Sequence, residues 1–433
     1  MKRFVIIGTG GRGTDSYAAT LLKEFPDTIQ LAGLYDLNPK RAEATNLILG
    51  TQIPVFTDVD AMLRTVQPHA VIVTSKDSTH AGYVVKALEA GINVFSEKPL
   101  CTTREQVAAI RAAAARSSAT GYVTHNMRFT PDLEDFKRLL QEGAVGRVLS
   151  MQFTETLDRH HGADYFRRWH RFMDNSSGLM VHKASHHFDV LNWFAASRPA
   201  TVTAQGRLAF YGRNGARRGP RCSTCPHGAQ CEFYADVFRN ERTRLLYQGP
   251  EVVDGYFRDG CVFDERINIP DTMAATIAYE NGIIASYSLI AYASYESMRL
   301  AVEGTRGRLE LYQRYGTSWA VGHPGSQADA SLADASLAND GRDLDDRRQF
   351  LWFLPPEPRP RLIPERKVTG GHGGSDPKLR AFLFTEAGQD DPLGLKAPLE
   401  DGIQAVLVGV SMNASMAAGG MPIRVQSGET AWP

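Results

Sequence analysis

The chain has 433 residues, of which 48 are basic and 48 acidic, so its formal net charge is zero. The length predicts two domains with an ample core, and the balanced charge argues against nucleic acid or an anionic membrane as a partner. No apolar run is long enough to span a bilayer, and the apolar start is too short for a signal peptide, so we expect a cytoplasmic protein. Five cysteines in a chain of this size do not make a disulfide framework.

The first residues predict a strand that ends in a glycine-rich turn. Residues 2–7 read KRFVII, and Gly8, Gly10 and Gly13 follow with the G-x-G-x-x-G spacing. Gly8 permits a tight turn, Gly10 lets a pyrophosphate approach the backbone, and Gly13 lets the next helix pack closely. The N-terminus of that helix offers free N–H groups to the phosphates.

A carboxylate follows the second predicted strand, at the position where a dinucleotide-binding unit carries an acid. An uncharged strand is predicted over 29–35, and it ends at Asp36, about 20 residues beyond the last glycine. A carboxylate there binds the adenosine ribose hydroxyls and repels a 2′-phosphate, and no arginine is adjacent to it in the sequence. Strand, glycine turn, helix, strand and acid therefore predict a Rossmann unit that binds NAD.

The first part of the chain alternates strands and helices, which predicts an α/β fold with a doubly wound parallel sheet. Beyond Asp36 we expect helices at 39–49, 58–65, 81–90 and 104–117, and strands at 54–56, 70–74, 93–95 and 121–124. The strand at 70–74 carries no charge, as a strand buried on both faces should. We place this domain at residues 1–124.

The pattern changes in residues 125–433, which predict a second, α+β domain. After a helix at 132–142, alternating strands are expected at 148–154, 201–210, 273–279, 283–292, 299–302 and 308–312. They predict a large open, antiparallel-rich sheet, whose uncovered face we expect to join copies into a homodimer or homotetramer. A helix is predicted at 179–194 and another at 403–418, the latter packing toward the domain junction. Surface loops are predicted at 325–341 and 355–364.

Several motifs occur in combination along nearly the whole chain. They are GTGGRG at 8–13, Asp36, Glu97-Lys98-Pro99 after a strand, Asn126-x-Arg128-Phe129, and HKASHHFD at 182–189. Together they resemble the Gfo/Idh/MocA oxidoreductase family. The resemblance implies an NAD(P)-binding Rossmann domain, an α/β substrate domain, and hydride transfer between nicotinamide and a sugar or polyol carbon.

The resemblance also implies where the cofactor binds. It places Lys98 beside the nicotinamide and the substrate hydroxyl, on a turn that a cis bond at Pro99 would shape. An ammonium group there can hydrogen-bond the oxygen whose charge changes during hydride transfer. The residues expected at the cofactor are Gly8, Gly10, Gly11, Arg12, Gly13, Asp36, Thr74, His80, Glu97, Lys98 and Asn126.

The motif at 182–189 carries the candidate proton acceptor. The family pattern has Asp, Gly, His and Asp at its first, third, fifth and eighth positions; here His182 replaces the Asp and Ala184 the Gly. On one continuous helix, His182, His186 and Asp189 would share a face. A histidine can take the hydroxyl proton because its pKa lies near the operating pH. We assign this role to His186, with Lys183 as a rival and His182 as a further catalytic candidate.

The stretch 158–171 is unusually aromatic for a solvated loop. Its rings could stack on sugar faces, and its arginines could hold an acidic sugar. A glycine-rich loop at 370–376 could also approach the ligand, or be a plain flexible loop. The residues expected to bind substrate are Arg128, Tyr165, Arg168, Trp169, His187 and His372.

Four cysteines raise the possibility of a metal. Cys222-x2-Cys225-x5-Cys231 lies in one loop, and Cys261 follows downstream. Four thiolates suit tetrahedral zinc, so we expect a structural zinc that staples an insertion. Free thiols, a disulfide and an iron–sulfur cluster are the alternatives.

Three functions follow, in order of preference. The first is an NAD-dependent oxidoreductase that acts on a sugar or glycoside hydroxyl. The second is an NAD-requiring glycoside hydrolase, which oxidises a ring hydroxyl, eliminates the aglycone, adds water and returns the hydride. The crowd of His160, His161, His182, Lys183, His186 and His187 suits its extra proton transfers. The third is a non-catalytic NAD-binding regulator.

Overall fold

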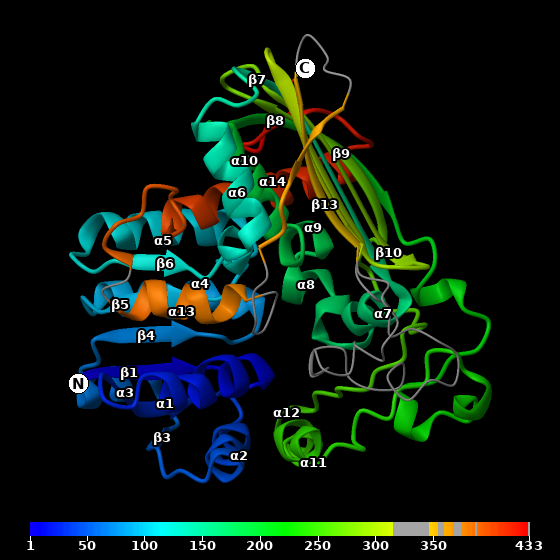
Figure 1. The fold of residues 1–433 in the computed structure, drawn as a ribbon. Helices are drawn as coiled ribbons and strands as arrows, with labels where there is room; N and C mark the ends of the chain where they lie inside the picture. The colour runs from blue at the N-terminus through cyan, green and yellow to red at the C-terminus, as the bar shows by residue number, and fades with distance from the viewer. Residues whose placement is uncertain (315–345, 354–358, 367–373, 386–387, 432–433) are drawn as a thin grey trace.

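The computed structural model describes residues 1–314, 346–353, 359–366, 374–385 and 388–431. Within these ranges the chain forms a seven-stranded and a nine-stranded β-sheet that lie side by side, with helices between them (Figure 1). The predicted loop at 325–341 and the candidate substrate residue His372 fall outside the described residues.

The smaller sheet confirms the predicted doubly wound parallel domain. Its strand order is β15-β6-β5-β4-β1-β2-β3, and only β15 runs antiparallel to its neighbour. The strands are β1 (Lys2–Ile7), β2 (Ile29–Tyr35), β3 (Val55–Phe56), β4 (Ala70–Val73), β5 (Asn93–Ser96), β6 (Gly121–Val123) and β15 (Ala397–Pro398). The helices are the π-helix η1 (Arg12–Ala19), α1 (Thr20–Glu24), α2 (Pro39–Leu49), α3 (Val59–Val66), α4 (Asp77–Glu89) and α5 (Arg104–Arg116). The strand order reverses between β1 and β4, where open α/β sheets bind ligands at their carboxyl ends.

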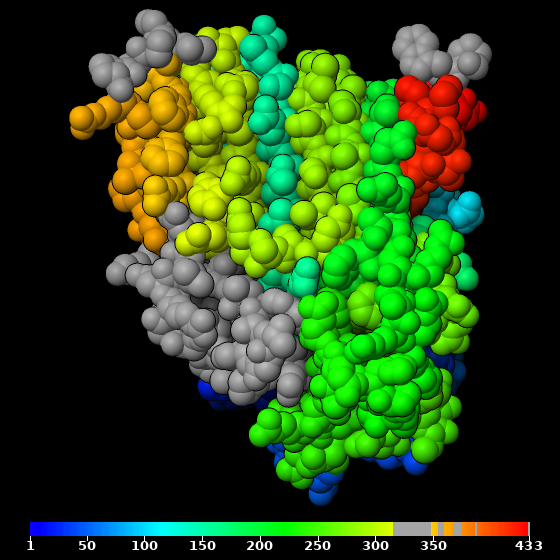
Figure 2. Space-filling view, turned by 90° about the vertical axis from the view of Figure 1, so that its right-hand side faces the viewer, coloured from blue at the N-terminus to red at the C-terminus, as the bar shows by residue number. Residues whose placement is uncertain are grey.

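The larger sheet has the order β14-β13-β12-β11-β7-β10-β9-β8-β16 and is antiparallel except between β7 and β10. The strands are β7 (Val148–Asp158), β8 (Pro199–Arg207), β9 (Thr272–Tyr279), β10 (Ile284–Ala293), β11 (Ser297–Gly304), β12 (Gly307–Arg314), β13 (Asp346–Phe353), β14 (Arg361–Ile363) and β16 (Ile423–Arg424). Figure 2 shows them as adjacent stripes on the surface, with β7 in teal. This confirms the open, antiparallel-rich sheet with one covered face.

The remaining helices and single turns lie between the two sheets and in an insertion between β8 and β9. They are η2 (Asn126–Phe129), α6 (Pro131–Gln141), α7 (Arg159–Arg167), η3 (Trp169–Arg171), α8 (Met173–Ser176), α9 (Leu179–His182), α10 (Ser185–Ala195), η4 (Gly212–Asn214), η5 (Cys222–Thr224), η6 (Gly228–Gln230), α11 (Glu241–Thr243), η7 (Arg244–Gln248), α12 (Glu251–Asp254), α13 (Ser375–Phe384) and α14 (Leu399–Ala417). No helix among the described residues is both long and apolar enough to cross a membrane.

The structure corrects two predicted elements. The single helix expected at 179–194 is broken into α9 and α10, so His182 and His186 do not share one continuous helix. At the break the His182 carbonyl accepts hydrogen bonds from Lys98 Nζ, at 3.1 Å, and from the Ser185 hydroxyl, at 3.4 Å. The loop expected at 355–364 contains the edge strand β14, because Arg361–Ile363 pairs with β13.

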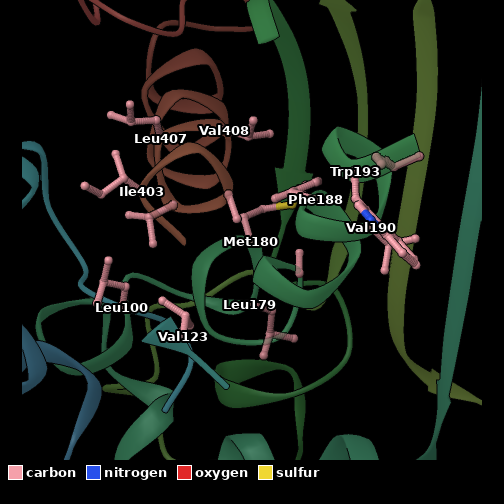
Figure 3. Packing of buried hydrophobic residues seen from close by; sticks show 14 of the residues in the cluster. Leu100, Val123, Leu179, Met180, Phe188, Val190, Trp193, Ile403, Leu407 and Val408 are labelled. Atoms are coloured by element: carbon pink, nitrogen blue, oxygen red, sulfur yellow. The ribbon is translucent and has the colours of Figure 1, made fainter. Parts of the chain in front are cut away.

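The last long helix, α14, joins the two halves of the molecule. It packs on β6 and β15 of the smaller sheet and on α9, α10 and β8 of the second domain, which confirms its predicted place at the junction. The side chains around it form one buried cluster (Figure 3); they include Leu100, Val123, Leu179, Met180, Phe188, Val190, Trp193, Ile403, Leu407 and Val408. The position of the active site between the sheets therefore depends on this core.

Truncating Leu407 should weaken the junction. Leu407 is 2% exposed, and Leu407→Ala leaves a cavity that costs about 2–5 kcal/mol of unfolding free energy. We expect a clearly lower thermal midpoint. Leu47→Ala is the control, because that leucine is 67% exposed in α2. Equal midpoints for the two variants would contradict this account of the core.

Candidate active site at the junction of the two sheets

The glycine turn after β1 has the geometry of a dinucleotide cradle. Gly8 has φ +97°, and a Cβ on it would lie 2.5 Å from Ser75 N. A Cβ on Gly13 would lie 2.0 Å from Gly8 O, whereas one on Gly10 would meet only the Tyr247 hydroxyl, at 3.5 Å. The Thr74 hydroxyl donates to Gly8 O. Two glycines are thus required by packing, and the third leaves space above the backbone for a ligand.

Asp36 is held at the end of β2 by donors from three residues, Thr9, Asn38 and Arg41. The Thr9 N–H donates to Oδ2 at 2.8 Å, and the Asn38 N–H donates to Oδ1 at 2.9 Å. Arg41 Nη1 donates to Oδ1 at 3.0 Å. No arginine is adjacent to Asp36 in the sequence, but the first turn of α2 brings Arg41 to this carboxylate. The site thus presents the expected acid together with a neighbouring cation.

Three further predicted cofactor residues meet at the carboxyl end of β5. Arg12 Nε donates to Glu97 Oε1 at 2.7 Å, and the Tyr17 hydroxyl donates to the same oxygen at 2.8 Å. Arg12 and Asn126 both donate to Asp376, at 3.1 and 2.8 Å. Asp376 lies in the first turn of α13, so a segment distant in the sequence closes this network beside the glycine turn.

Lys98 lies on a buried turn that His80 stabilises. The Lys98–Pro99 bond is cis, as the resemblance implied. His80 Nδ1 lies 2.7 Å from Pro99 O and its Nε2 lies 2.9 Å from Ser75 O, so this ring links the turns after β4 and β5. Burial lowers the pKa of Lys98. An ammonium group with a lowered pKa is well suited to exchange a proton with a substrate oxygen.

His182 is held against Asp77. Its Nδ1 lies 2.5 Å from Asp77 Oδ2, across the gap between α9 and the start of α4. Burial lowers the pKa of His182 and raises the pKa of Asp77, which disfavours a fully charged pair. Since the carbonyl of His182 also accepts a hydrogen bond from Lys98, His182 connects the second domain to this half-buried lysine.

His186, in contrast to its rival Lys183, is an uncharged candidate for the proton acceptor. Its Nδ1 is buried and has no hydrogen-bond partner within the described ranges, and burial lowers its pKa well below the usual value. The ring is therefore neutral, and it packs edge-on against His125 at 5.6 Å. Lys183 Nζ lies 2.9 Å from Glu155 Oε1. Burial lowers the pKa of Lys183, but Glu155 and other nearby acidic groups raise it by more, so its pKa lies above the usual value and Lys183 stays charged.

His187 and Arg128, both expected to bind substrate, have structural partners instead. His187 is fully buried, and its Nδ1 lies 2.8 Å from the Tyr287 hydroxyl. Arg128 makes a two-point ion pair with Asp189, at 2.6 and 2.8 Å, and donates to Asp401 at 2.9 Å. Their burial and contacts favour a supporting role over direct contact with substrate.

The aromatic stretch forms helix α7 and the turn η3, and it surrounds His182. The rings of Tyr165 and Trp169 lie 5.4 and 5.8 Å from the His182 ring. The Tyr165 hydroxyl is 3.0 Å from His161 Nε2, and His161 Nδ1 is 2.9 Å from Glu296 Oε2. Burial raises the pKa of Tyr165, but the nearby cations, His161 first, lower it below its usual value.

The arginines of this stretch have carboxylate or sulfur partners. Arg168 Nη1 lies 2.5 Å from Asp164 Oδ2, and Arg171 Nη2 lies 3.5 Å from Asp264 Oδ2. Arg167 Nη1 donates to Cys222 Sγ at 3.0 Å. These contacts argue against the idea that the three arginines hold an acidic sugar.

The four cysteines of the insertion line one small cavity. In the described part of the chain, however, no group of three or more His, Cys, Asp or Glu side chains is arranged to hold a metal ion. All four thiols are free, and Cys222 Sγ accepts its hydrogen bond from Arg167. The predicted structural zinc at Cys222, Cys225, Cys231 and Cys261 is therefore not supported.

Sequence reasoning missed the acids that position these groups. Glu155 could have been found, because it occupies an inward position of alternating strand β7, next to buried Phe153 and Leu157. Asp77 follows a strand end but belongs to no motif, and Glu296 is far from His161 in the sequence. Only the fold brings these two carboxylates to their histidines.

The His161–Glu296 pair predicts a pH-dependent stability. Burial lowers the pKa of His161, but Glu296 and Tyr165 together outweigh burial and raise the pKa from 6.5 to about 10. The stabilisation is therefore complete below about pH 6.5 and is lost as the pH rises to about 10. The melting temperature of Glu296→Gln should fall below wild type at pH 6, and the gap should close toward pH 10. Glu265→Gln, a control at a 74% exposed side chain, should show no such trend. A gap that is constant with pH would refute the assignment.

Comparisons with known proteins agree with this architecture. Residues 2–125 match the family model described as "Oxidoreductase family, NAD-binding Rossmann fold", and residues 137–425 match its "C-terminal alpha/beta domain". Among solved structures, a levoglucosan dehydrogenase in complex with NADH and L-sorbose shares the fold, with a TM-score of 0.67 and 17% identity. That alignment covers 99% of this chain and 100% of the other.

Two relatives extend the comparison. YteT of Bacillus subtilis (strain 168), which carries a provisional oxidoreductase name, is 32% identical over 437 residues, 96% of each chain. Inositol 2-dehydrogenase of Rhizobium meliloti (strain 1021) is 26% identical over 175 residues, which are 40% of this chain and 50% of that protein. The two family models together span nearly the whole sequence, and the chain belongs to the Gfo/Idh/MocA family of oxidoreductases with an NAD-binding Rossmann domain.

Proposed function

We propose that the protein is an NAD-dependent oxidoreductase that transfers a hydride between the cofactor and a hydroxyl-bearing carbon of a sugar, glycoside or polyol. The observation that carries this proposal is the turn that bears Lys98. The ammonium group of Lys98, whose pKa is lowered, donates a hydrogen bond to the carbonyl of His182 in the second domain. The same segment carries His186, whose ring is neutral. Relatives named levoglucosan dehydrogenase and inositol 2-dehydrogenase support a polyhydroxylated substrate.

The side chains can handle the proton that accompanies the hydride. Bound NAD supplies the hydride acceptor, nicotinamide C4. Lys98 donates a hydrogen bond to the substrate oxygen and stabilises the negative charge that grows on it as the hydroxyl proton leaves. His186 is neutral and takes that proton. Lys183, held by Glu155, keeps its charge and orients the substrate.

Asp36 supports NAD as the preferred cofactor. Its carboxylate would accept hydrogen bonds from ribose hydroxyls and repel a 2′-phosphate. Arg41 lies beside it, but its guanidinium already binds Asp36 and Asp254, at 3.0 and 2.7 Å, so it is not free for a phosphate.

A second candidate function is an NAD-requiring glycosidase. Tyr165, with its lowered pKa and its link through His161 to Glu296, adds a proton-transfer group beyond those a dehydrogenase needs. After oxidation of a ring hydroxyl, such a group could remove the acidified neighbouring C–H proton. The aglycone then leaves, water adds, and the hydride returns to the sugar.

We also propose that copies associate through the outer face of the nine-stranded sheet, forming a homodimer or homotetramer. Among the described residues no helix covers this face along its strands (Figure 2), whereas the inner face packs on helices.

A paired assay should distinguish the first two functions. The protein is incubated with NAD and a panel of neutral and acidic sugars and glycosides, and NADH and aglycone are followed in the same samples. For a dehydrogenase, NADH rises in step with substrate loss. Aglycone release without net NADH, and only with NAD present, would instead establish the glycosidase.

Variants of the two catalytic candidates test the site. Lys98→Ala and His186→Ala should each lower kcat by roughly 10²- to 10⁴-fold, with little change in NAD affinity measured by fluorescence titration. Lys76→Ala is the matched control, because Lys76 donates to Asn175 on the surface. Wild-type rates in both catalytic variants would overturn the assignment, and a protein that binds NAD but turns over no substrate would be the regulator.

A further inference from the structure

Residues 241–258 of the second domain, the covering segment, lie against the glycine turn and helix α2. Figure 1 shows α11 and α12 of this segment beside α2. We propose that the covering segment closes over the pyrophosphate and adenosine half of NAD, that Tyr247 contacts the dinucleotide, and that the cofactor therefore stays bound between turnovers. This inference rests on the proposed function, because it requires NAD in the Rossmann domain.

The first argument is the position of the Tyr247 hydroxyl. Gly11 N–H, in the middle of the G-x-G-x-x-G turn, donates to this oxygen at 2.7 Å. The same oxygen lies nearest to the space above Gly10. A phenol that accepts one hydrogen bond still has its own proton to donate. The oxygens of a pyrophosphate are the acceptors for which such a turn is built.

The second argument is the set of contacts at the adenosine side. Arg41 of α2 binds Asp36 and also donates to Leu246 O at 3.1 Å and to Asp254 Oδ2 at 2.7 Å. Asn38 Nδ2 donates to Pro250 O at 2.9 Å. Asn38 is fully buried and Asp36 is only 8% exposed, so the covering segment screens the ribose-binding acid from solvent.

The third argument is that the covering segment is anchored. Leu246 and Tyr247 belong to a buried apolar cluster with Phe238 and Cys222 of the insertion and Ala44 of α2. The guanidinium of Arg258, a side chain that is 1% exposed, lies 4.7 Å from the centre of the Tyr247 ring. Arg242 pairs with Asp15 of the helix that follows the turn. NAD held beneath these contacts can leave only after several of them open.

The consequence is slow release of the nucleotide rather than a new chemical step. Tyr247 acts on the cofactor, and Asp254 acts by fixing the covering segment to Arg41. Both should raise the lifetime of bound NAD without taking part in hydride transfer.

The test measures nucleotide release directly. Protein loaded with labelled NAD is chased with excess unlabelled NAD, and retained label is followed for wild type, Tyr247→Phe and Asp254→Asn. A lost hydrogen bond in this site should speed release by about 3- to 10-fold. Thermal midpoints of the NAD-free proteins show whether each variant is folded.

Tyr256→Phe is the matched control. Tyr256 lies in the same segment, with its ring 6.2 Å from that of Tyr247, and its hydroxyl has no hydrogen-bond partner among the described residues. This variant should release NAD at the wild-type rate.

The outcomes separate this inference from the proposed function. Faster release from Tyr247→Phe and Asp254→Asn, but not from Tyr256→Phe, supports the covering segment. Equal release from all proteins overturns the inference while NAD binding still supports the oxidoreductase. Wild-type protein that binds no NAD would overturn the proposed function itself, and the inference with it.

Discussion

The partial burial of a charged amine, Lys98, is the constraint on which the candidate site depends. Moving an ammonium group out of water costs several kcal/mol unless hydrogen bonds and opposite charges replace the lost solvent. Here the compensation comes from both domains. Glu97 and Asp77 of the first domain act on its charge, and the carbonyl of His182 accepts its hydrogen bond from the second. The lysine can therefore have its native environment only when the two sheets are docked, which gives the α14 junction its importance.

The same principle decides which of the other basic groups of the site are charged and which are neutral. Lys183 and His161 each have a carboxylate within 2.9 Å, Glu155 and Glu296 respectively, and are held in their charged forms. Among the described residues His186 Nδ1 has no such partner, and the ring is neutral. Charge complementarity thus separates the groups held in their charged forms from His186, which we propose as the proton acceptor. Burial and the neighbouring cations keep the His186 imidazole neutral, and by lowering its pKa they also make it a weaker base.

The extent to which the sequence predicts this structure follows the range of the interactions. The glycine turn, Asp36 and the Glu97-Lys98-Pro99 turn depend on residues close together in the chain, and the fold places them where the motifs indicated. The break between α9 and α10 could not be predicted, since it involves Lys98 from another domain. The same holds for Asp77, Glu296 and Asp376, each of which meets its partner only after folding. The cysteine spacing suggested zinc, but spacing alone does not fix how the thiols point.

The covering segment connects the fold to the choice between the two candidate reactions. A dehydrogenase that releases NADH after every turnover gains little from a packed segment over the Rossmann turn, because opening it would slow each cycle. A reaction that takes a hydride from a sugar and later returns it needs the reduced nucleotide to stay until the second transfer. We infer that the contacts of Tyr247 with the turn, and of Arg41 with Leu246 O and Asp254, retain the nucleotide. The cluster of titratable groups around Tyr165 would serve the proton transfers between the two hydride steps. These two features lie in different parts of the second domain, and they are the observations on which the second candidate function, an NAD-requiring glycosidase, rests beside the proposed dehydrogenase.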